Sequence, residues 1–319
     1  MQMTTSFIQQ FTFALVASTA VAASAMSVGC GDNQFIAEGE HYQYVVSEIS
    51  LATSASEAAI QGLDIDGDGR RDNALGAVFG LLRGEGFDIQ PDVTTAVRNG
   101  GILMGLDVQT PNLRDANFIG VQAYRGMSAV PPPCGSSDPA SCGQHLLGNA
   151  QIRVAPAMEV NYATGPLQQG EAVTRADELT LKLALGADVL IDVMLHDVVI
   201  RLTDLTATTG VATFAGVVSV RDVNDVVIPQ AAKQFNRIID RDCAIVAPAT
   251  ECTCALDSGG AGLVGLLDAN RDCEVSDAEM LNNGIVRALT TPDIDSSVGP
   301  GMSFAVRAKL VGAQLLPTP

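Results

Sequence analysis

Tryptophan is absent from this 319-residue chain, and aromatic residues make up only 4% of it. Basic side chains are scarce as well, because 18 Lys and Arg stand against 36 Asp and Glu, which gives a formal net charge of −18. Nucleic acids and anionic membranes bind basic surfaces, so this balance argues against both as partners. We therefore expect a core built from aliphatic side chains and an acidic surface that suits divalent cations.

Common catalytic motifs are also missing. The sequence contains no Gly-x-Ser-x-Gly elbow, no His-Glu-x-x-His and no phosphate loop ending in Gly-Lys-Ser/Thr. Its three histidines, His41, His145 and His196, lie far apart along the chain. His196 falls in a β-rich apolar run, where we expect a surface or core residue and not a catalytic base. The sequence thus predicts neither a catalytic residue nor an organic cofactor.

No charged side chain occurs in the first 29 residues. The apolar stretch that begins at Phe11 is too short to span a membrane and is typical of a secretion signal. The segment Ser27-Val28-Gly29-Cys30 resembles a bacterial lipobox, in which the cysteine receives lipid. We expect residues 1–29 to be a signal peptide and Cys30 to anchor the protein in the bacterial cell envelope, at the outer membrane or in the periplasm. Ala23-Ser24-Ala25 fits an ordinary signal-peptidase site, so plain secretion is one alternative and an uncleaved anchor is another.

The six cysteines that follow Cys30 form an even set, as expected in an oxidising compartment. They are Cys134, Cys142, Cys243, Cys252, Cys254 and Cys273. The first two flank a loop rich in Gly, Ser and Pro and are expected to close it. Cys252 and Cys254 are too close in an extended segment to bridge each other comfortably, so they would pair with the remaining two in either order. Zinc is the competing interpretation, but no His lies nearby and the CxxC spacing is missing.

Residues 64–72 have the spacing of a calcium loop. Calcium takes six to eight oxygens, and such loops supply side chains at positions one, three, five and nine and a backbone carbonyl at seven. The predicted ligands are Asp64, Asp66, Asp68, the Arg70 carbonyl and Asp72. Gly69 at position six permits the positive φ of the sharp turn. Because Leu75 replaces the bidentate Glu at position twelve, this loop looks more like those of thrombospondin type-3 repeats and dockerins than an EF-hand. The alternative is a plain Asp-Gly turn, although adjacent carboxylates repel one another without a cation.

Residues 268–279 match the EF-hand register more closely. The predicted ligands are Asp268, Asn270, Asp272, the Glu274 carbonyl, Ser276 and Glu279. Cys273 stands where Gly belongs, at a cost of roughly 1 kcal/mol or more if its φ is positive. A disulfide from Cys273 to the 252–254 segment could hold that turn. The alternative is a helix–turn–helix with a solvated acidic turn.

Hydropathy patterns predict an α+β fold that is mainly β. Residues 179–185, 189–202 and 211–220 alternate or run apolar between Gly, Asp and Thr breaks, which favours an antiparallel, sandwich-like sheet. Short helices are expected to flank the calcium loops, at 74–82, 259–267 and 277–289. We divide the mature chain into an N-terminal region (30–130), a disulfide-closed linker loop (131–143), a β-rich region (144–232) and a C-terminal region with the EF-hand-like loop (233–319).

The lipobox-like Cys30, the loop from Leu63 to Gly76, the β-rich middle and the late EF-hand before Thr291-Pro292-Asp293-Ile294-Asp295 together resemble a group of uncharacterised myxobacterial-type lipoproteins. That resemblance implies calcium and the cell envelope but no reaction. We therefore predict a calcium-binding, envelope-anchored protein with a structural or binding role, whose membrane contact is its lipid anchor. A calcium-dependent extracellular hydrolase and a carrier of an apolar ligand are the alternatives.

Overall fold

The computed structural model describes residues 38–84, 87–155, 162–186, 189–245 and 251–317. The expected signal peptide and Cys30 lie outside the described residues. Three predicted features of the fold are confirmed: an α+β architecture that is mainly β, a large and mostly antiparallel sheet, and short helices.

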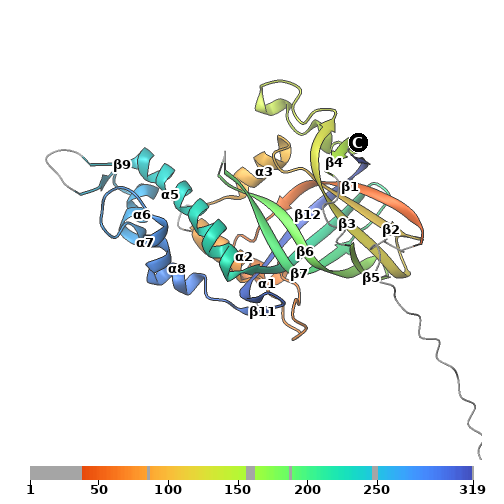
Figure 1. The fold of residues 1–319 in the computed structure, drawn as a ribbon. Coiled ribbons are helices and arrows are strands. Elements are labelled where there is room, and N and C mark those ends of the chain that lie inside the picture. Colours follow the sequence, from red (N-terminus) through yellow and green to blue (C-terminus); the bar gives the residue numbers. More distant parts are fainter. Residues whose placement is uncertain (1–37, 85–86, 156–161, 187–188, 246–250, 318–319) are drawn as a thin grey trace, which may run out of the picture. The chain divides into compact units, whose positions relative to one another are not determined.

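Eight strands pair in a ring that closes on itself (Figure 1). They follow one another around the ring in chain order, and the last strand pairs with the first. They are β1 (Glu40–Ser50), β2 (Met104–Thr110), β3 (Ala116–Val130), β5 (Tyr162–Gln168), β6 (Glu171–Gly186), β7 (Val189–Thr203), β8 (Thr209–Ser219) and β12 (Gly299–Pro317). All eight pairings around the ring are antiparallel. The predicted antiparallel sheet therefore takes the form of one closed layer, built from strands of all three regions expected from the sequence.

The interior of the ring is filled by alternate residues of its strands. On β7, Val189, Ile191, Val193 and Leu195 are buried in the main core, and on β12 the buried series includes Phe304 and Val306. This period of two is the ordinary consequence of strand geometry, which points successive side chains to opposite faces. Tyr44, Phe214 and Phe304 are among the largest fully buried side chains, so several of the few aromatic residues lie in the core.

The short strand β4 (Ala150–Val154) extends the sheet beyond the ring. It pairs with the end of β3 and, in parallel, with the end of β12. A second small core forms here from residues that include Val45, Leu103, Ile152 and Leu315. A Cβ at Gly105 would lie 2.7 Å from the Leu315 side chain, so glycine is what permits these segments to approach so closely.

Helices cover parts of the ring and build the C-terminal region. They are α1 (Ala55–Gln61), α2 (Ala74–Gly84), α3 (Gln90–Arg98), α4 (Val220–Asp222), α5 (Ile228–Asp242), α6 (Gly259–Leu267), α7 (Asp277–Asn282) and α8 (Gly284–Leu289), with short 3-10 turns η1 (Pro139–Ser141) and η2 (Gln144–Leu146). A π-helical turn, η3 (Val223–Val227), joins α4 to α5. The expected single helix over 277–289 is wrong, because Asn283 ends α7 and caps α8 by accepting hydrogen bonds from Ile285 and Val286.

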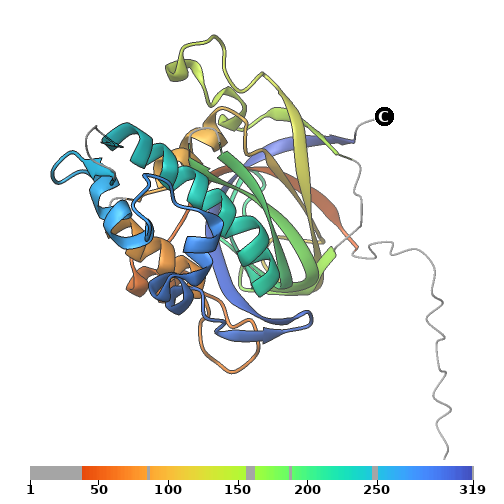
Figure 2. The ribbon, with the colours of Figure 1, turned by 60° about the vertical axis from the view of Figure 1, so that its left-hand side comes forward.

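Helix α5 links the C-terminal helices to the strands. It contacts β6, β7, α6 and α7, and Figure 2 shows it beside the ring with α6 to α8 on its other side. Its buried residues are Ile228, Ala232, Phe235 and Ile239, which recur at helical spacing on one face. Phe235 packs edge-on against Phe87 with ring centroids 4.9 Å apart. Two further short strands, β9 (Cys243–Ala244) and β10 (Thr253–Cys254), pair after α5, and β11 (Ile294–Ser296) pairs with β12.

Candidate functional site

The loop at 64–72 turns its carboxylates toward its own backbone. Asp64 accepts hydrogen bonds from the N–H groups of Gly67 (2.7 Å) and Gly69 (3.1 Å) through its two oxygens. Asp66 accepts one from Asp68 (3.0 Å), and Asp68 accepts one from Arg70 (2.7 Å). Gly67 and Gly69, at positions four and six, both have a φ of +85°. The glycines therefore permit the tight turn that the sequence predicted.

Three of the four predicted carboxylates of this loop lie close together. Oxygens of Asp64, Asp66 and Asp72 are all within 4.8 Å of one another, whereas Asp68 lies outside this group and contacts Arg70 at 3.8 Å. Burial raises the pKa of Asp72, and the charges of Asp66 and Asp68 raise it further. A hydrogen bond from the Ile65 N–H lowers this pKa but does not outweigh them. A cation held among these oxygens would offset that repulsion.

Apolar contacts fix this loop to the outer face of the ring. Leu63 and Ile65 are buried in a separate cluster with Val199, Ala215 and Val217 of strands β7 and β8. The chain also forms a bridge at the ends of the loop, where the Asp72 N–H donates to the Leu63 carbonyl at 2.9 Å. The loop is thus a short turn on a rigid base, which suits a preformed site.

Arg175 on β6 is a partner of this loop that sequence analysis missed. Its guanidinium donates to the backbone carbonyls of Ile65 (2.9 Å) and Asp64 (3.3 Å). The two segments are separated by 110 residues in sequence, so no local pattern links them.

The second loop, at 268–279, shares three of these hydrogen bonds with the first, from position six to one, from five to three and from seven to five, but its position one accepts from position five where the first loop uses position four. Asp268 accepts from Asp272 (3.2 Å) and Cys273 (3.0 Å), Asn270 accepts from Asp272 (3.0 Å), and Asp272 accepts from Glu274 (2.9 Å). Arg271 and Cys273, at positions four and six, have φ values of +58° and +66°. The backbone is therefore left-handed at the positions where the first loop has its two glycines.

Cys273 occupies this left-handed position as a member of a disulfide. The structure pairs Cys252 with Cys273, Cys243 with Cys254, and Cys134 with Cys142. The Cys252 N–H also donates to the Arg271 carbonyl at 2.8 Å. The predicted closure of the 134–142 loop is confirmed, and the order that the sequence left open is decided. The expected disulfide from Cys273 to the 252–254 segment is present.

Glu279 and Ser276, the predicted ligands at positions twelve and nine, form a capping box at the start of α7. The Glu279 carboxylate also reaches across the loop and accepts from the Ala269 N–H at 3.0 Å. Burial raises the pKa of Glu279, but hydrogen bonds from Ser276, Asn270 and Ala269 outweigh it and leave the pKa below its usual value. The carboxylates of the second loop do not come as close together as those of Asp64, Asp66 and Asp72. Within the described ranges, the one other group of three potential metal ligands within 4.8 Å of one another consists of cysteines that form disulfides.

Asn236 on α5 supports the second loop and was also missed in the sequence. Its side chain accepts from the Val275 N–H (2.7 Å) and donates to the Val275 carbonyl (3.0 Å). Val275 is 1% exposed and occupies position eight of the loop. Both backbone groups of this buried loop residue are thereby satisfied by one amide side chain from helix α5.

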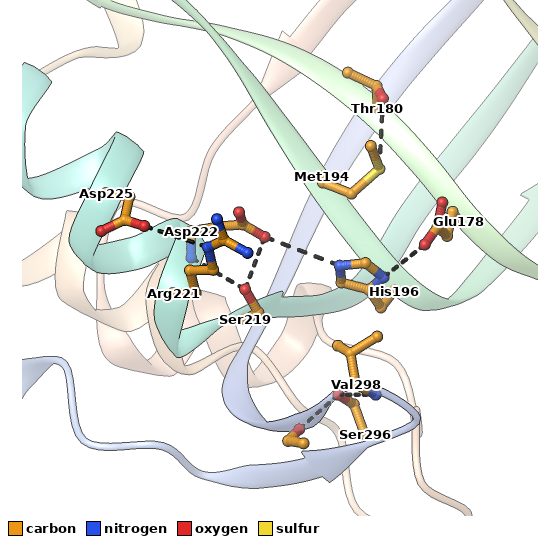
Figure 3. A network of polar contacts seen from close by, with 11 residues as sticks. Glu178, Thr180, Met194, His196, Ser219, Arg221, Asp222, Asp225, Ser296 and Val298 are labelled. Atoms are coloured by element: carbon orange, nitrogen blue, oxygen red, sulfur yellow. Dashed lines mark hydrogen bonds and ion pairs between the residues drawn. The ribbon is translucent and has the colours of Figure 1, made fainter. Parts of the chain in front are cut away.

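A separate cavity of about 590 Å³ lies where β7, β8 and the turn before β12 meet. Its polar lining comes from His196, Ser219, Arg221, Asp222 and Asp225, and its apolar lining from Val220, Val226, Val298 and Pro300. Figure 3 shows the His196 ring between two carboxylates. Its Nδ1 lies 3.1 Å from Glu178 and its Nε2 3.9 Å from Asp222, which accepts a hydrogen bond from Ser219 Oγ at 2.8 Å.

Comparison with protein-family models, curated proteins and solved structures found no match for this chain. In the part of the chain that the structure describes, no helix is long and apolar enough to cross a membrane. The resemblance to myxobacterial-type lipoproteins stays a prediction.

Proposed function

We propose that this protein binds calcium at residues 64–72 and 268–279 and that the ions stabilise the fold of a lipid-anchored bacterial envelope protein with a structural or binding role. The observation that carries the proposal is the pattern that the two loops share. Their sequences differ, yet in both loops position one accepts from the N–H of position six, position three from that of position five, and position five from that of position seven. Positions four and six are left-handed in both. Two unrelated acidic turns would not be expected to share both these hydrogen bonds and these left-handed positions.

The donor set suits calcium, which prefers carboxylate, amide and carbonyl oxygens over nitrogen or sulfur. In the first loop Asp64, Asp66 and Asp72 would hold the ion, with Asp68 and the Arg70 carbonyl as further candidates. In the second loop the candidates are the carboxylates of Asp268, Asp272 and Glu279, the amide oxygen of Asn270, the Glu274 carbonyl and Ser276. We expect weak, constitutive binding with dissociation constants of roughly 10⁻⁴ to 10⁻³ M, as in extracellular calcium modules.

The envelope part of the proposal rests on the sequence and on the cysteines. Three disulfides are compatible with an oxidising compartment. Residues 1–30 would supply the export signal and the lipid-bearing Cys30. Mass spectrometry of the protein from bacterial membranes tests this part. A diacylglycerol-modified N-terminal Cys30 supports it, and an unmodified thiol on a cleaved chain favours plain secretion.

Calorimetric titration of the full chain with calcium tests the metal sites. We expect two binding events in the wild type and one in each of the variants Asp64→Ala and Asp268→Ala. Asp240→Ala, which removes an exposed charge from α5, is the matched control and should keep both events. If the wild type gives no binding heat and unfolds at the same temperature in chelator, both loops are only acidic turns.

A further inference from the structure

His196 is held by carboxylates from two elements at the wall of a cavity. Its side chain is 12% exposed, its Nδ1 faces Glu178 on β6, and its Nε2 faces Asp222 on α4 (Figure 3). His41 offers a comparison, since it also pairs with a carboxylate, that of Asp107 at 3.0 Å, but it is 53% exposed and does not line this cavity. The arrangement around His196 is thus more than a surface ion pair.

The backbone around this cavity is irregular at three places. Strand β7 shifts register between His196 and Val199, and Asp197 within that shift has a φ of +50°. Across this shift, the residues of β7 buried in the main core change from odd to even numbers, from Leu195 to Val198, because one extra residue turns the strand. The cavity wall also includes part of the π-helical turn 223–227. Bulges, left-handed non-glycine residues and π-turns all concentrate at functional sites.

The strained residue is tied into the structure. The Asp197 carboxylate accepts a hydrogen bond from the Ser297 N–H at 2.7 Å, next to Val298 of the cavity lining. The bulge therefore positions His196 and, through Asp197, the turn that contributes Val298 to the cavity lining.

We propose that this cavity is a hydrolytic site for uncharged carboxylic esters in which His196 is the general base. Glu178 lies 3.1 Å from Nδ1 but outside hydrogen-bond geometry, and among the described residues Nδ1 is buried without another hydrogen-bond partner. A small reorientation of the carboxylate would let it accept from Nδ1–H and leave the Nε2 lone pair toward the cavity, in the way that a carboxylate orients a catalytic imidazole. The 3.9 Å between Nε2 and the Asp222 oxygen allows one water molecule to bond to both at ordinary hydrogen-bond lengths. Glu178 and Asp222 are positioning residues in this proposal.

The chemical step balances without a further reactant. The water oxygen forms a bond to the ester carbonyl carbon while one of its protons passes to Nε2 of His196. The tetrahedral intermediate then breaks its bond to the alkoxide, which takes the proton from the imidazolium. One ester and one water yield one carboxylic acid and one alcohol, and His196 returns to its neutral form.

The lining of the cavity sets the class of substrate. The cavity lining carries two carboxylates, Asp222 and Asp225, against one guanidinium, that of Arg221, which is paired with Asp225 at 3.4 Å. The remaining negative charge disfavours phosphate and carboxylate groups by repulsion. Val220, Val226 and Val298 offer apolar walls to a short acyl or alkyl chain. An uncharged aliphatic ester satisfies both conditions.

Hydrolysis of p-nitrophenyl butyrate by the full chain, at fixed calcium, tests the proposal independently of the metal loops. We expect His196→Ala to lose about 100-fold or more of the enzymatic rate, since a positioned general base contributes at least that much. Added imidazole should restore part of the lost rate. Glu178→Gln should lower kcat more than it raises KM and shift the pH profile of the rate.

His41→Ala is the matched control and should retain the wild-type rate. If His196→Ala unfolds at a lower temperature than the wild type, His196→Gln replaces it, because glutamine keeps most of the side-chain volume. The proposal is wrong if the wild type is no faster than the His196 variant, or if His41→Ala loses as much activity.

Discussion

Replacing Asn236 with alanine should weaken calcium binding at the second loop and leave the first loop unchanged. The Asn236 amide satisfies both the N–H and the carbonyl of Val275, which is buried. Each hydrogen bond contributes about 0.5–1.5 kcal/mol net, and an unsatisfied buried group costs about 1–3 kcal/mol. We therefore expect a loss of about 2–3 kcal/mol in the closed form of the loop.

This loss lowers the calcium affinity only in so far as calcium binds the closed form of the loop and not the open form. If half of it is expressed in affinity, about 1.4 kcal/mol corresponds to a tenfold weaker dissociation constant. Calorimetry in an Asp64→Ala background isolates the second site. Asn236→Asp keeps the acceptor for the Val275 N–H but lacks the donor for its carbonyl, so its affinity should lie between those of the wild type and Asn236→Ala.

Lys233→Ala is the matched control, because Lys233 is an exposed residue of the same helix. Equal affinities in Asn236→Ala and Lys233→Ala would refute the reasoning and show that α7 and the disulfide alone hold the loop. An equal loss at both calcium sites would point to general unfolding of the chain instead.

Two further predictions concern stability. Replacing Cys252 and Cys273 together by alanine removes a disulfide whose cysteines are 21 residues apart. Chain entropy predicts a loss of about 3 kcal/mol in the free energy of unfolding. Urea unfolding should show this loss, and an unchanged midpoint would contradict it. Burial lowers the pKa of His145 below its usual value of 6.5, outweighing a backbone contact with Val97 that raises it. The unfolded chain therefore binds a proton at His145 that the folded chain does not, so stability should fall as pH drops through about 6.5. Thermal unfolding between neutral and mildly acidic pH checks this, and His145→Gln should flatten the dependence.

The two acidic loops also show how different sequences reach one backbone shape. The first uses glycine at positions four and six, whereas the second uses Arg271 and Cys273 with the disulfide to Cys252. Because a left-handed L-residue costs roughly 1–2 kcal/mol, the second loop needs support from outside, and Cys252 and Asn236 supply it.

Local features of this protein follow from its sequence alone. The alternate oxygens at 64–72 and 268–279, the period-two burial of β7 and the closure of the 134–142 loop all depend on residues close in sequence, whose backbone geometry is fixed by spacing. The single error among the helices near the acidic loops was also local, because the ability of Asn283 to end one helix and cap the next was overlooked.

Tertiary structure alone decided the features that join distant segments. The ring closes through β1 and β12, Arg175 holds a loop 110 residues away, and His196 meets Asp222 only because a bulge re-aims its strand. The order of the two C-terminal disulfides belongs to the same group. Each of these contacts depends on which apolar faces of distant segments pack together. Many alternative pairings are equally compatible with the local sequence, and only the complete core selects one of them. Spacing along the chain does not determine which of these pairings forms, so the two acidic loops could be predicted and the His196 cavity could not.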